Sequence, residues 1–230
     1  MGKKVLLVGA TGLVGQGVLH VFLQAPDIDR VTALVRRPLA VGHPKLRVLQ
    51  VAGFSAPALA TLDLSGIDAC VYCAGPLPLG MSEVSYREAT VATLSRVVDA
   101  YAAAKPGGFI AYVSGKGADA HSRLMPARVK GEAEQVLARC ELPHTNVRPG
   151  VVRPVAGAIS PHLLRRRLYA LGQPVLAAGA RLLPGVFTTT QAIGECMLQL
   201  VRASGPRPAV VENIRIGTTM AIPRAPAAHG

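Results

Sequence analysis

Short, uninterrupted apolar runs alternate with longer stretches of helical periodicity along most of the chain. A strand that is apolar at every position is buried on both faces, which is typical of a parallel sheet. Strands that alternate with helices indicate βαβ units. The sequence therefore predicts an α/β fold with one doubly wound, Rossmann-type parallel sheet flanked by helices. We expect strands at 5–8, 31–35, 46–51, 69–73, 109–113 and 145–147, and helices at 13–23, 83–104 and 130–139.

The pattern is less regular beyond Gly150, where we expect helices at 161–169 and 190–202 and one more strand at 209–216. No linker or internal repeat separates a second domain. We therefore expect one domain over residues 1–220, with a small substrate-side region from about residue 151. Residues 221–230, rich in Ala and Pro, are expected to form a flexible tail.

Composition excludes several classes of protein. Half of the 230 residues are apolar and 17% are charged, which excludes an intrinsically disordered chain. No apolar run approaches the roughly 20 residues that a membrane span needs. The apolar run at 5–8 is too short for an export signal, so we expect a cytoplasmic protein. Cys70 and Cys73 lie on an expected strand, where residues three apart point to opposite faces, and we interpret them as core thiols rather than metal ligands.

The net charge of +12 is compatible with nucleic acid, acidic lipid or an anionic small ligand. Most basic residues are scattered singly, and aromatic residues make up only 4% of the chain. We therefore do not expect nucleic-acid binding, and a small anion is favoured. The one dense basic cluster, Arg165–Arg167, is either a solvated helix face or a surface that docks on acidic partners.

A glycine-rich turn, Gly9-Ala10-Thr11-Gly12-Leu13-Val14-Gly15, directly follows the first expected strand and opens the first expected helix. In this position, the pattern predicts a dinucleotide site. Gly9 allows the tight turn, Gly12 lets a pyrophosphate approach the backbone, and Gly15 lets the helix pack close to the sheet. The backbone N–H groups at the helix start, including those near Thr11, Leu13 and Val14, then face the phosphate charge.

The end of the second expected strand indicates which dinucleotide is bound. NAD sites usually carry a carboxylate there, which binds the ribose hydroxyls. This chain has Arg36 and Arg37 instead. Guanidinium groups match the oxygens of a 2′-phosphate, so the sequence favours NADP over NAD.

Three further pieces carry a family resemblance: Ser114-Gly115-Lys116-Gly117-Ala118-Asp119, Val129-Lys130-Gly131-Glu132 and Arg148-Pro149-Gly150. With the glycine turn, they make residues 3–216 similar to the atypical short-chain dehydrogenase/reductases, and most similar to the subgroup of the Tat-interacting oxidoreductase-like protein. The resemblance implies NAD(P) binding and reduction of a carbonyl or oxidation of a hydroxyl. It also implies that Ala74 and Gly75 border the cofactor.

The resemblance implies a catalytic Ser, Tyr and Lys, with the last two in the pattern Tyr-x-x-x-Lys. Ser114 matches the serine and Lys130 matches the lysine, which also holds the nicotinamide ribose. Pro126 stands where the tyrosine is expected, and proline cannot transfer a proton. Tyr86, Tyr112 and Tyr169, and His121 in the preceding loop, remain candidates for acid–base work. We expect Tyr112 to be buried.

Two functions remain open on this basis. The first is an NADP-dependent oxidoreductase with a degenerate acid site, in which Lys130 or a bound water replaces the tyrosine. The second is a non-catalytic NADP-binding sensor or scaffold. The sequence does not specify the small-molecule substrate. Leu163, Leu176 and Phe187 are apolar candidates for lining its pocket. The sequence is compatible with either a monomer or a homodimer.

Overall fold

The structure is a computed structural model that describes residues 2–154 and 186–217. Its main sheet has seven parallel strands in the order β3-β2-β1-β4-β5-β6-β9. The strands are β1 (Lys3–Val8), β2 (Ile28–Val35), β3 (Leu46–Gln50), β4 (Ala69–Tyr72), β5 (Phe109–Val113), β6 (His144–Arg148) and β9 (Val210–Glu212). This is a doubly wound sheet, as predicted from the sequence: successive strands are added on one side of β1 up to β3 and on the other side from β4 onward.

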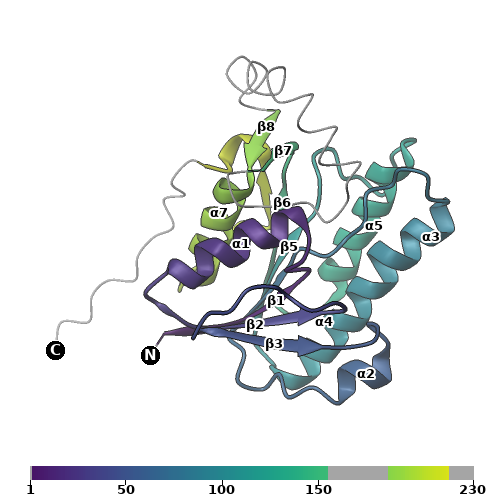
Figure 1. Cartoon of the computed structure of the whole chain (residues 1–230). Coiled ribbons are helices and arrows are strands. Elements are labelled where there is room, and N and C mark those ends of the chain that lie inside the picture. The colour runs from purple at the N-terminus through teal and green to yellow at the C-terminus, as the bar shows by residue number, and fades with distance from the viewer. Residues whose placement is uncertain (1, 155–185, 218–230) are drawn as a thin grey trace.

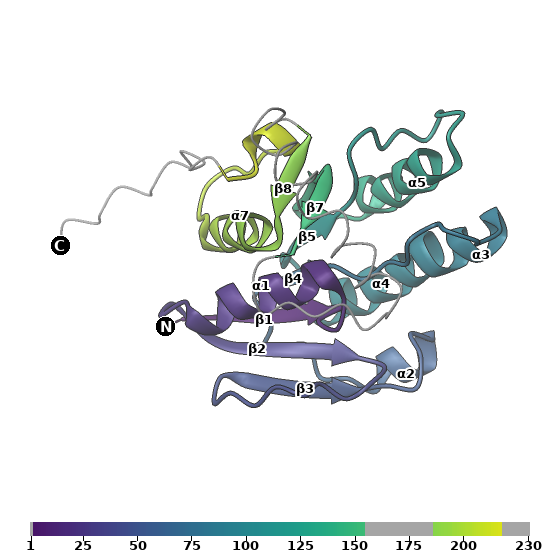
Figure 2. The same ribbon diagram turned by 45° about the horizontal axis from the view of Figure 1, so that its top comes forward.

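Helices cover both faces of the sheet (Figures 1 and 2). They are α1 (Leu13–Gln24), α2 (Ala56–Ala60), α3 (Glu83–Arg87), α4 (Thr93–Ala104), α5 (Met125–Arg139) and α7 (Thr190–Arg202), with a π-helical turn, η1 (Glu88–Ala92), between α3 and α4 and a 3₁₀ turn, η2 (Asn213–Arg215), after β9. A second, two-stranded parallel sheet pairs β7 (Val151–Arg153) with β8 (Phe187–Thr189).

The central strand β1 shows why the core has two halves. Val5 and Leu7 face α1 and α7, whereas Leu6 and Val8 face α2, α4 and α5. All four side chains are fully buried, because neighbouring residues of a strand point to opposite faces and both faces are covered. The uninterrupted apolar runs in the sequence are therefore a direct consequence of this layering.

Two of the expected elements differ in detail from the structure. The expected helix at 83–104 is interrupted by η1, where Thr93 N–H and its hydroxyl both bond to the carbonyl of Glu88. The expected strand at 209–216 is only three residues long and is followed by η2. The expected helix at 190–202 is confirmed, whereas the one at 161–169 lies outside the described residues.

Candidate functional site

The glycine turn lies at the carboxyl end of β1, opposite the end of β4. Gly9 has φ +89°, a backbone conformation that L side chains rarely adopt, and a Cβ there would lie 2.5 Å from the backbone N of Ala74. A Cβ on Gly15 would lie 2.0 Å from the carbonyl O of Gly9. Both glycines are therefore required by the packing of the chain on itself.

Gly12 differs from the other two. It is the N-cap of α1 with extended backbone, φ −79°, and a Cβ there would come within 3.3 Å of only the Gly9 carbonyl O. Its N–H donates to that carbonyl at 3.0 Å. A side chain at Gly12 would therefore make one close backbone contact, whereas a Cβ on Gly9 or Gly15 would overlap the backbone.

The start of α1 can accept an anion. The first turn holds no acidic residue, and its first N–H groups have no acceptor within the helix. Leu13 buries its side chain, so only its backbone faces the turn, while Thr11 and Val14 are half-buried. Gln16 steadies the turn because its Nε2 donates to the carbonyl O of Thr11 at 3.0 Å.

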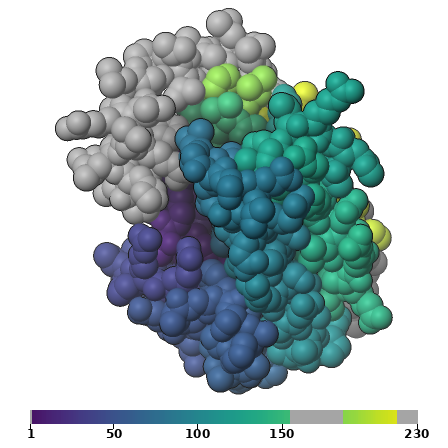
Figure 3. All heavy atoms as spheres, turned by 90° about the vertical axis from the view of Figure 1, so that its right-hand side faces the viewer, coloured from purple at the N-terminus to yellow at the C-terminus, as the bar shows by residue number. Residues whose placement is uncertain are grey.

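Figure 3 looks at the edge where the strands end. The purple N-terminal segment lies at the bottom of a recess, between the blue segment that includes β2, β3 and α2 and the dark teal segment of α3 and α4. Arg36 and Arg37 follow β2 directly at this edge and are exposed. The guanidinium of Arg36 stacks on the ring of Phe54, with Cζ 5.7 Å from the ring centroid, and this contact limits its motion.

Ser114 follows β5 at the same edge. Its N–H donates to the carbonyl O of Val147 at 2.8 Å, which fixes the backbone beyond the strand. The side chain is 6% exposed, and its Oγ has no hydrogen-bond partner among the described residues. A buried hydroxyl without a partner is costly, which makes it a candidate for binding a ligand oxygen or a water molecule.

Lys130 extends from α5 to the end of β5. Its Nζ donates to Tyr112 Oη at 3.1 Å and to the carbonyl O of Val113 at 3.2 Å. A Cβ on Gly75 would lie 3.6 Å from this Nζ, so Lys130 lies beside the segment that follows β4. Burial lowers the pKa of Lys130 to about 8, and the negative charge of Glu134 opposes that shift.

Pro126 is in the first turn of α5, which tolerates proline because its N–H groups lack helical acceptors. Leu124 is the N-cap, and the described residues provide no side-chain cap bond there. Ser122 does not cap the helix; its Oγ accepts from Leu124 N–H at 3.2 Å. Pro126 is exposed and lies one helical turn before Lys130, on the same side of α5.

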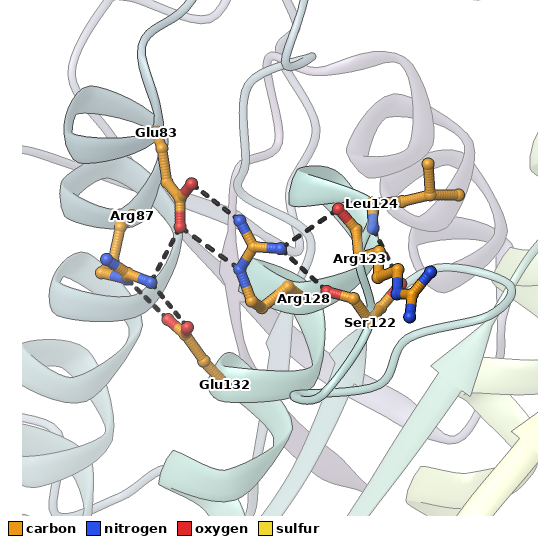
Figure 4. A network of polar contacts seen from close by, with 7 residues as sticks. All are labelled: Glu83, Arg87, Ser122, Arg123, Leu124, Arg128 and Glu132. Carbon is orange, nitrogen blue, oxygen red and sulfur yellow. Dashed lines mark hydrogen bonds and ion pairs between the residues drawn. The ribbon is translucent and has the colours of Figure 1, made fainter.

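An ion-pair network missed by the sequence analysis connects α3 with α5 (Figure 4). Glu83 accepts from Arg128 at 2.8 Å and from Arg87 at 3.0 Å, and Arg87 also pairs with Glu132 at 2.7 Å. Arg128 also donates to the carbonyl O of Ser122 at 2.8 Å. The network therefore ties the loop before α5, and the first turn of α5, to α3. The two ion pairs that join α3 to α5 each connect residues 45 positions apart in sequence, and no local sequence pattern predicts such pairs.

Of the other acid–base candidates, two are buried, one is exposed in a loop and one lies outside the described residues. Tyr86 and Tyr112 are buried, at 2% and 0% exposure, and Tyr169 lies outside the described residues. His121 is exposed in the loop before α5, where its N–H donates to Asp119 Oδ1 at 3.0 Å. The prediction that Tyr112 is buried is confirmed, whereas Tyr86 does not reach a cleft.

The cysteines are free thiols on opposite faces, as predicted. Cys70 belongs to the core half under α2, α4 and α5, and Cys73 packs against the half under α1 and α7. Within residues 2–154 and 186–217, no group of His, Cys, Asp or Glu side chains could hold a metal ion. In the same residues, no helix is long and apolar enough to cross a bilayer. Arg165–Arg167, Leu163 and Leu176 lie outside the described residues, and Phe187 lies in β8.

Comparison with known proteins identifies the fold. No protein-family model matches the sequence. A short chain dehydrogenase from Burkholderia cenocepacia in complex with NADP superimposes with a TM-score of 0.63, at 16% identity, over 92% of this chain and 87% of that one. The enzyme WbmH from Bordetella bronchiseptica, in complex with NAD⁺, gives 0.64 at 16% identity, over 89% and 73%. The chain therefore shares the Rossmann-like α/β fold of these two structures.

Two curated proteins are similar in sequence. Leucinostatins biosynthesis cluster protein T from Purpureocillium lilacinum is 30% identical over 135 residues, which cover 57% of this chain and 50% of that protein. Protein FMP52, mitochondrial, from Coccidioides immitis is 28% identical over 156 residues, 63% of each. The chain thus matches about half to two thirds of the length of these relatives. The subgroup predicted from the sequence is not among the similarities described here.

Proposed function

We propose that this chain binds NADP at the turn between β1 and α1 and acts as an oxidoreductase of the short-chain dehydrogenase type, on a small molecule with a carbonyl or hydroxyl group. The observation that carries the proposal is Gly12. Packing requires Gly9 and Gly15 more strictly than Gly12, where a Cβ would make a single close contact, 3.3 Å from the Gly9 carbonyl O. A dinucleotide pyrophosphate that rests on this backbone would supply a further reason for glycine at this position.

The preference for NADP rests on the end of β2. Arg36 and Arg37 are exposed there, and the next residues, Pro38, Leu39 and Ala40, bring no carboxylate. Because Arg36 already stacks on Phe54, its side chain loses less conformational entropy when the guanidinium binds a 2′-phosphate. The other cofactor-binding candidates, Ala74 and Gly75, follow β4, and the backbone N of Ala74 lies 2.5 Å from where a Cβ on Gly9 would be.

The residues around Lys130 fit the chemistry of carbonyl reduction. When bound, the dinucleotide supplies the hydride that adds to the carbonyl carbon. Lys130, with a pKa of about 8, is mostly protonated at neutral pH and can give a proton to the carbonyl oxygen. Ser114 Oγ, buried and without a partner in the described residues, can bind the same oxygen. Solvent then returns the proton to Lys130.

The second candidate function is a non-catalytic NADP-binding sensor or scaffold. Pro126 favours it, because this residue removes the proton donor from α5, and the phenol of Tyr112 is buried. Under this alternative the dinucleotide binds, but no turnover follows.

A titration with NADPH and NADH tests the binding proposal, followed by a screen of NADPH oxidation with aldehydes, ketones and quinones. Gly12→Val should abolish binding, because the branched side chain occupies the pyrophosphate position. Gly66→Val is the matched control, since a Cβ there meets nothing within 4 Å and Gly66 lies at the opposite end of the sheet. No saturable signal with either cofactor would overturn the proposal. Binding without any oxidation would favour the sensor.

A further inference from the structure

The ammonium of Lys130 has a defined orientation. A lysine ammonium has three protons to donate. Two are directed at Tyr112 Oη and at the carbonyl O of Val113, both in β5. The Nζ also lies 5.0 Å from the centroid of the Tyr112 ring. The third proton has no described acceptor. Gly75 is exposed beside the ammonium, because a Cβ built on Gly75 would lie 3.6 Å from Nζ.

Tyr112 cannot itself touch a substrate. Its side chain is fully buried in β5, and its ring lies 5.9 Å from that of Tyr72 in β4, tilted by 58°. Burial raises the pKa of Tyr112 well above its ordinary value of 10, so the phenol stays protonated. Any effect of Tyr112 on the site must therefore act through Lys130.

We propose that Tyr112 is a positioning residue, whose hydroxyl holds the ammonium of Lys130 in place so that its remaining N–H faces the recess beside Gly75. The phenol that contacts the lysine thus comes from β5, whereas α5 carries Pro126 at the position where the family resemblance implies a tyrosine. The inference deepens the proposed function, because it rests on Lys130 being the group that faces the reacting oxygen.

The charged and titratable groups around Lys130 come from α5, β5 and the segment that follows β4. Glu134 is one turn further along α5, but it is held by Arg148 of β6 at 2.6 Å. Cys73 follows β4, and burial raises the pKa of its thiol, so it stays neutral. Tyr112 lies in β5, and in turn faces Tyr72, Tyr86 and Glu134. Among these side chains, within the described residues, Tyr112 is therefore the one whose neutral hydroxyl accepts a hydrogen bond from Lys130.

The pKa of Lys130, measured directly, tests this inference. Hydrogen bonds to a charged group are stronger than those to a neutral one, so the Tyr112 hydroxyl favours the ammonium form. Tyr112→Phe removes the hydroxyl and keeps the ring. In protein labelled with ¹³C-lysine, the Cε resonance of Lys130, assigned by its loss in Lys130→Arg, should titrate about one pH unit lower in Tyr112→Phe than in wild type.

Tyr72→Phe is the matched control. Tyr72 is equally buried in the neighbouring strand, and its hydroxyl has no hydrogen-bond partner among the described residues. We expect Tyr72→Phe to leave the pKa of Lys130 unchanged. Equal titrations in Tyr112→Phe and wild type, or equal shifts in both variants, would overturn the inference. The readout needs neither cofactor nor turnover, so a failure of the proposed function is seen separately, in the NADPH titration.

A measurement on the wild type covers the case in which Tyr112→Phe does not fold. The ¹⁵N-labelled ammonium of Lys130 should exchange slowly with water and show nuclear Overhauser effects to the ring protons of Tyr112. An ammonium that exchanges as fast as that of an exposed lysine, without contacts to this ring, would contradict the inference. If turnover is found, Tyr112→Phe should lower kcat about fivefold near pH 8, with little change in KM for NADPH.

Discussion

Pro126 occupies an exposed place in the first turn of α5, one helical turn before Lys130. Pro126→Tyr puts a phenol on the same side of the helix as the lysine. We expect this variant to increase carbonyl reduction by roughly 10²–10⁴-fold, the usual contribution of a placed general acid. Steady-state NADPH oxidation measures the gain. Pro126→Phe should show none of it, and Lys130→Ala should cancel it. Brisk wild-type reduction that survives loss of both Ser114 and Lys130 would place the chemistry elsewhere.

Arg36 and Arg37 determine the expected cofactor preference. A hydrogen bond to a charged group contributes about 1.5–3 kcal/mol. Replacing both with Ala should weaken NADPH binding by at least tens-fold and leave NADH nearly unchanged, as measured by calorimetric titration. Arg30→Ala is the control, because Arg30 is exposed on the same strand at its other end. Equal wild-type affinity for the two cofactors would contradict the prediction.

The lowered pKa of Lys130 has a consequence for stability. Between pH 8 and its ordinary value of 10.5, the unfolded chain holds a proton that the folded chain has lost. Stability rises with pH wherever the unfolded state binds more protons, so the contribution of Lys130 becomes more favourable across this window. Below pH 8 the cost of burying the ammonium is fully present.

Lys130→Met removes this titration. From pH 7.5 to 9.5, we expect the free energy of unfolding of the wild type to rise by about 1–2 kcal/mol relative to the variant. Urea denaturation of both proteins at the two pH values measures the difference, and groups common to both cancel. A constant difference would show that Lys130 keeps its ordinary pKa.

At the scale of single residues, the sequence predicted the places of the glycine turn, Arg36 and Ser114, because each directly follows an apolar run that forms a strand. Lys130 lies within α5 and was predicted only from the family resemblance. It could not predict the partner of Lys130. Tyr112 is two residues before Ser114 on a fully buried strand, and whether a lysine on α5 reaches its hydroxyl depends on how closely α5 packs on β5.

At the scale of the elements, the loop 115–124 rests directly on α5. A Cβ on Gly131 would lie 2.1 Å from the backbone N of Ala120, and Asp119 N–H donates to the carbonyl O of Ala127 at 3.1 Å. Gly131→Ala should therefore destabilise the fold by about 1–3 kcal/mol through overpacking. Thermal unfolding tests this. Gly115→Ala in the same loop is the control, because a Cβ there meets nothing within 4 Å.

The turn η1 shows which features of an element escape sequence analysis. The stretch 83–104 has the composition of one long helix, and the chain is indeed helical throughout. The shift to π-helical bonding at Glu88–Ala92 accompanies the contact of this turn with α5, which depends on how the helices pack side by side on one face of the sheet. Residue periodicity describes a helix in isolation and carries no information on such contacts.

At the scale of the whole molecule, ligand binding should stabilise the folded chain. A ligand at 100 times its Kd adds about 2.7 kcal/mol, and for a chain of this size each kcal/mol raises Tm by roughly 2–4 °C. We expect NADPH to raise Tm by about 5–10 °C. Thermal unfolding monitored by circular dichroism checks this, with Gly12→Val as the variant that should not respond. An equal rise in that variant would mean that NADPH binds away from the turn.

The order in which the ribosome releases the strands differs from their order in the sheet. β6 pairs with β5 on one side, but its partner on the other side, β9 (Val210–Glu212), is synthesised more than 60 residues later. Until that strand emerges, β6 presents a row of unpaired backbone groups, which is a template for association with other chains. Domains fold from the N-terminus during synthesis, so the partly made protein passes through this open-edged state. The short strand β9 is therefore the segment whose arrival pairs the open edge of β6.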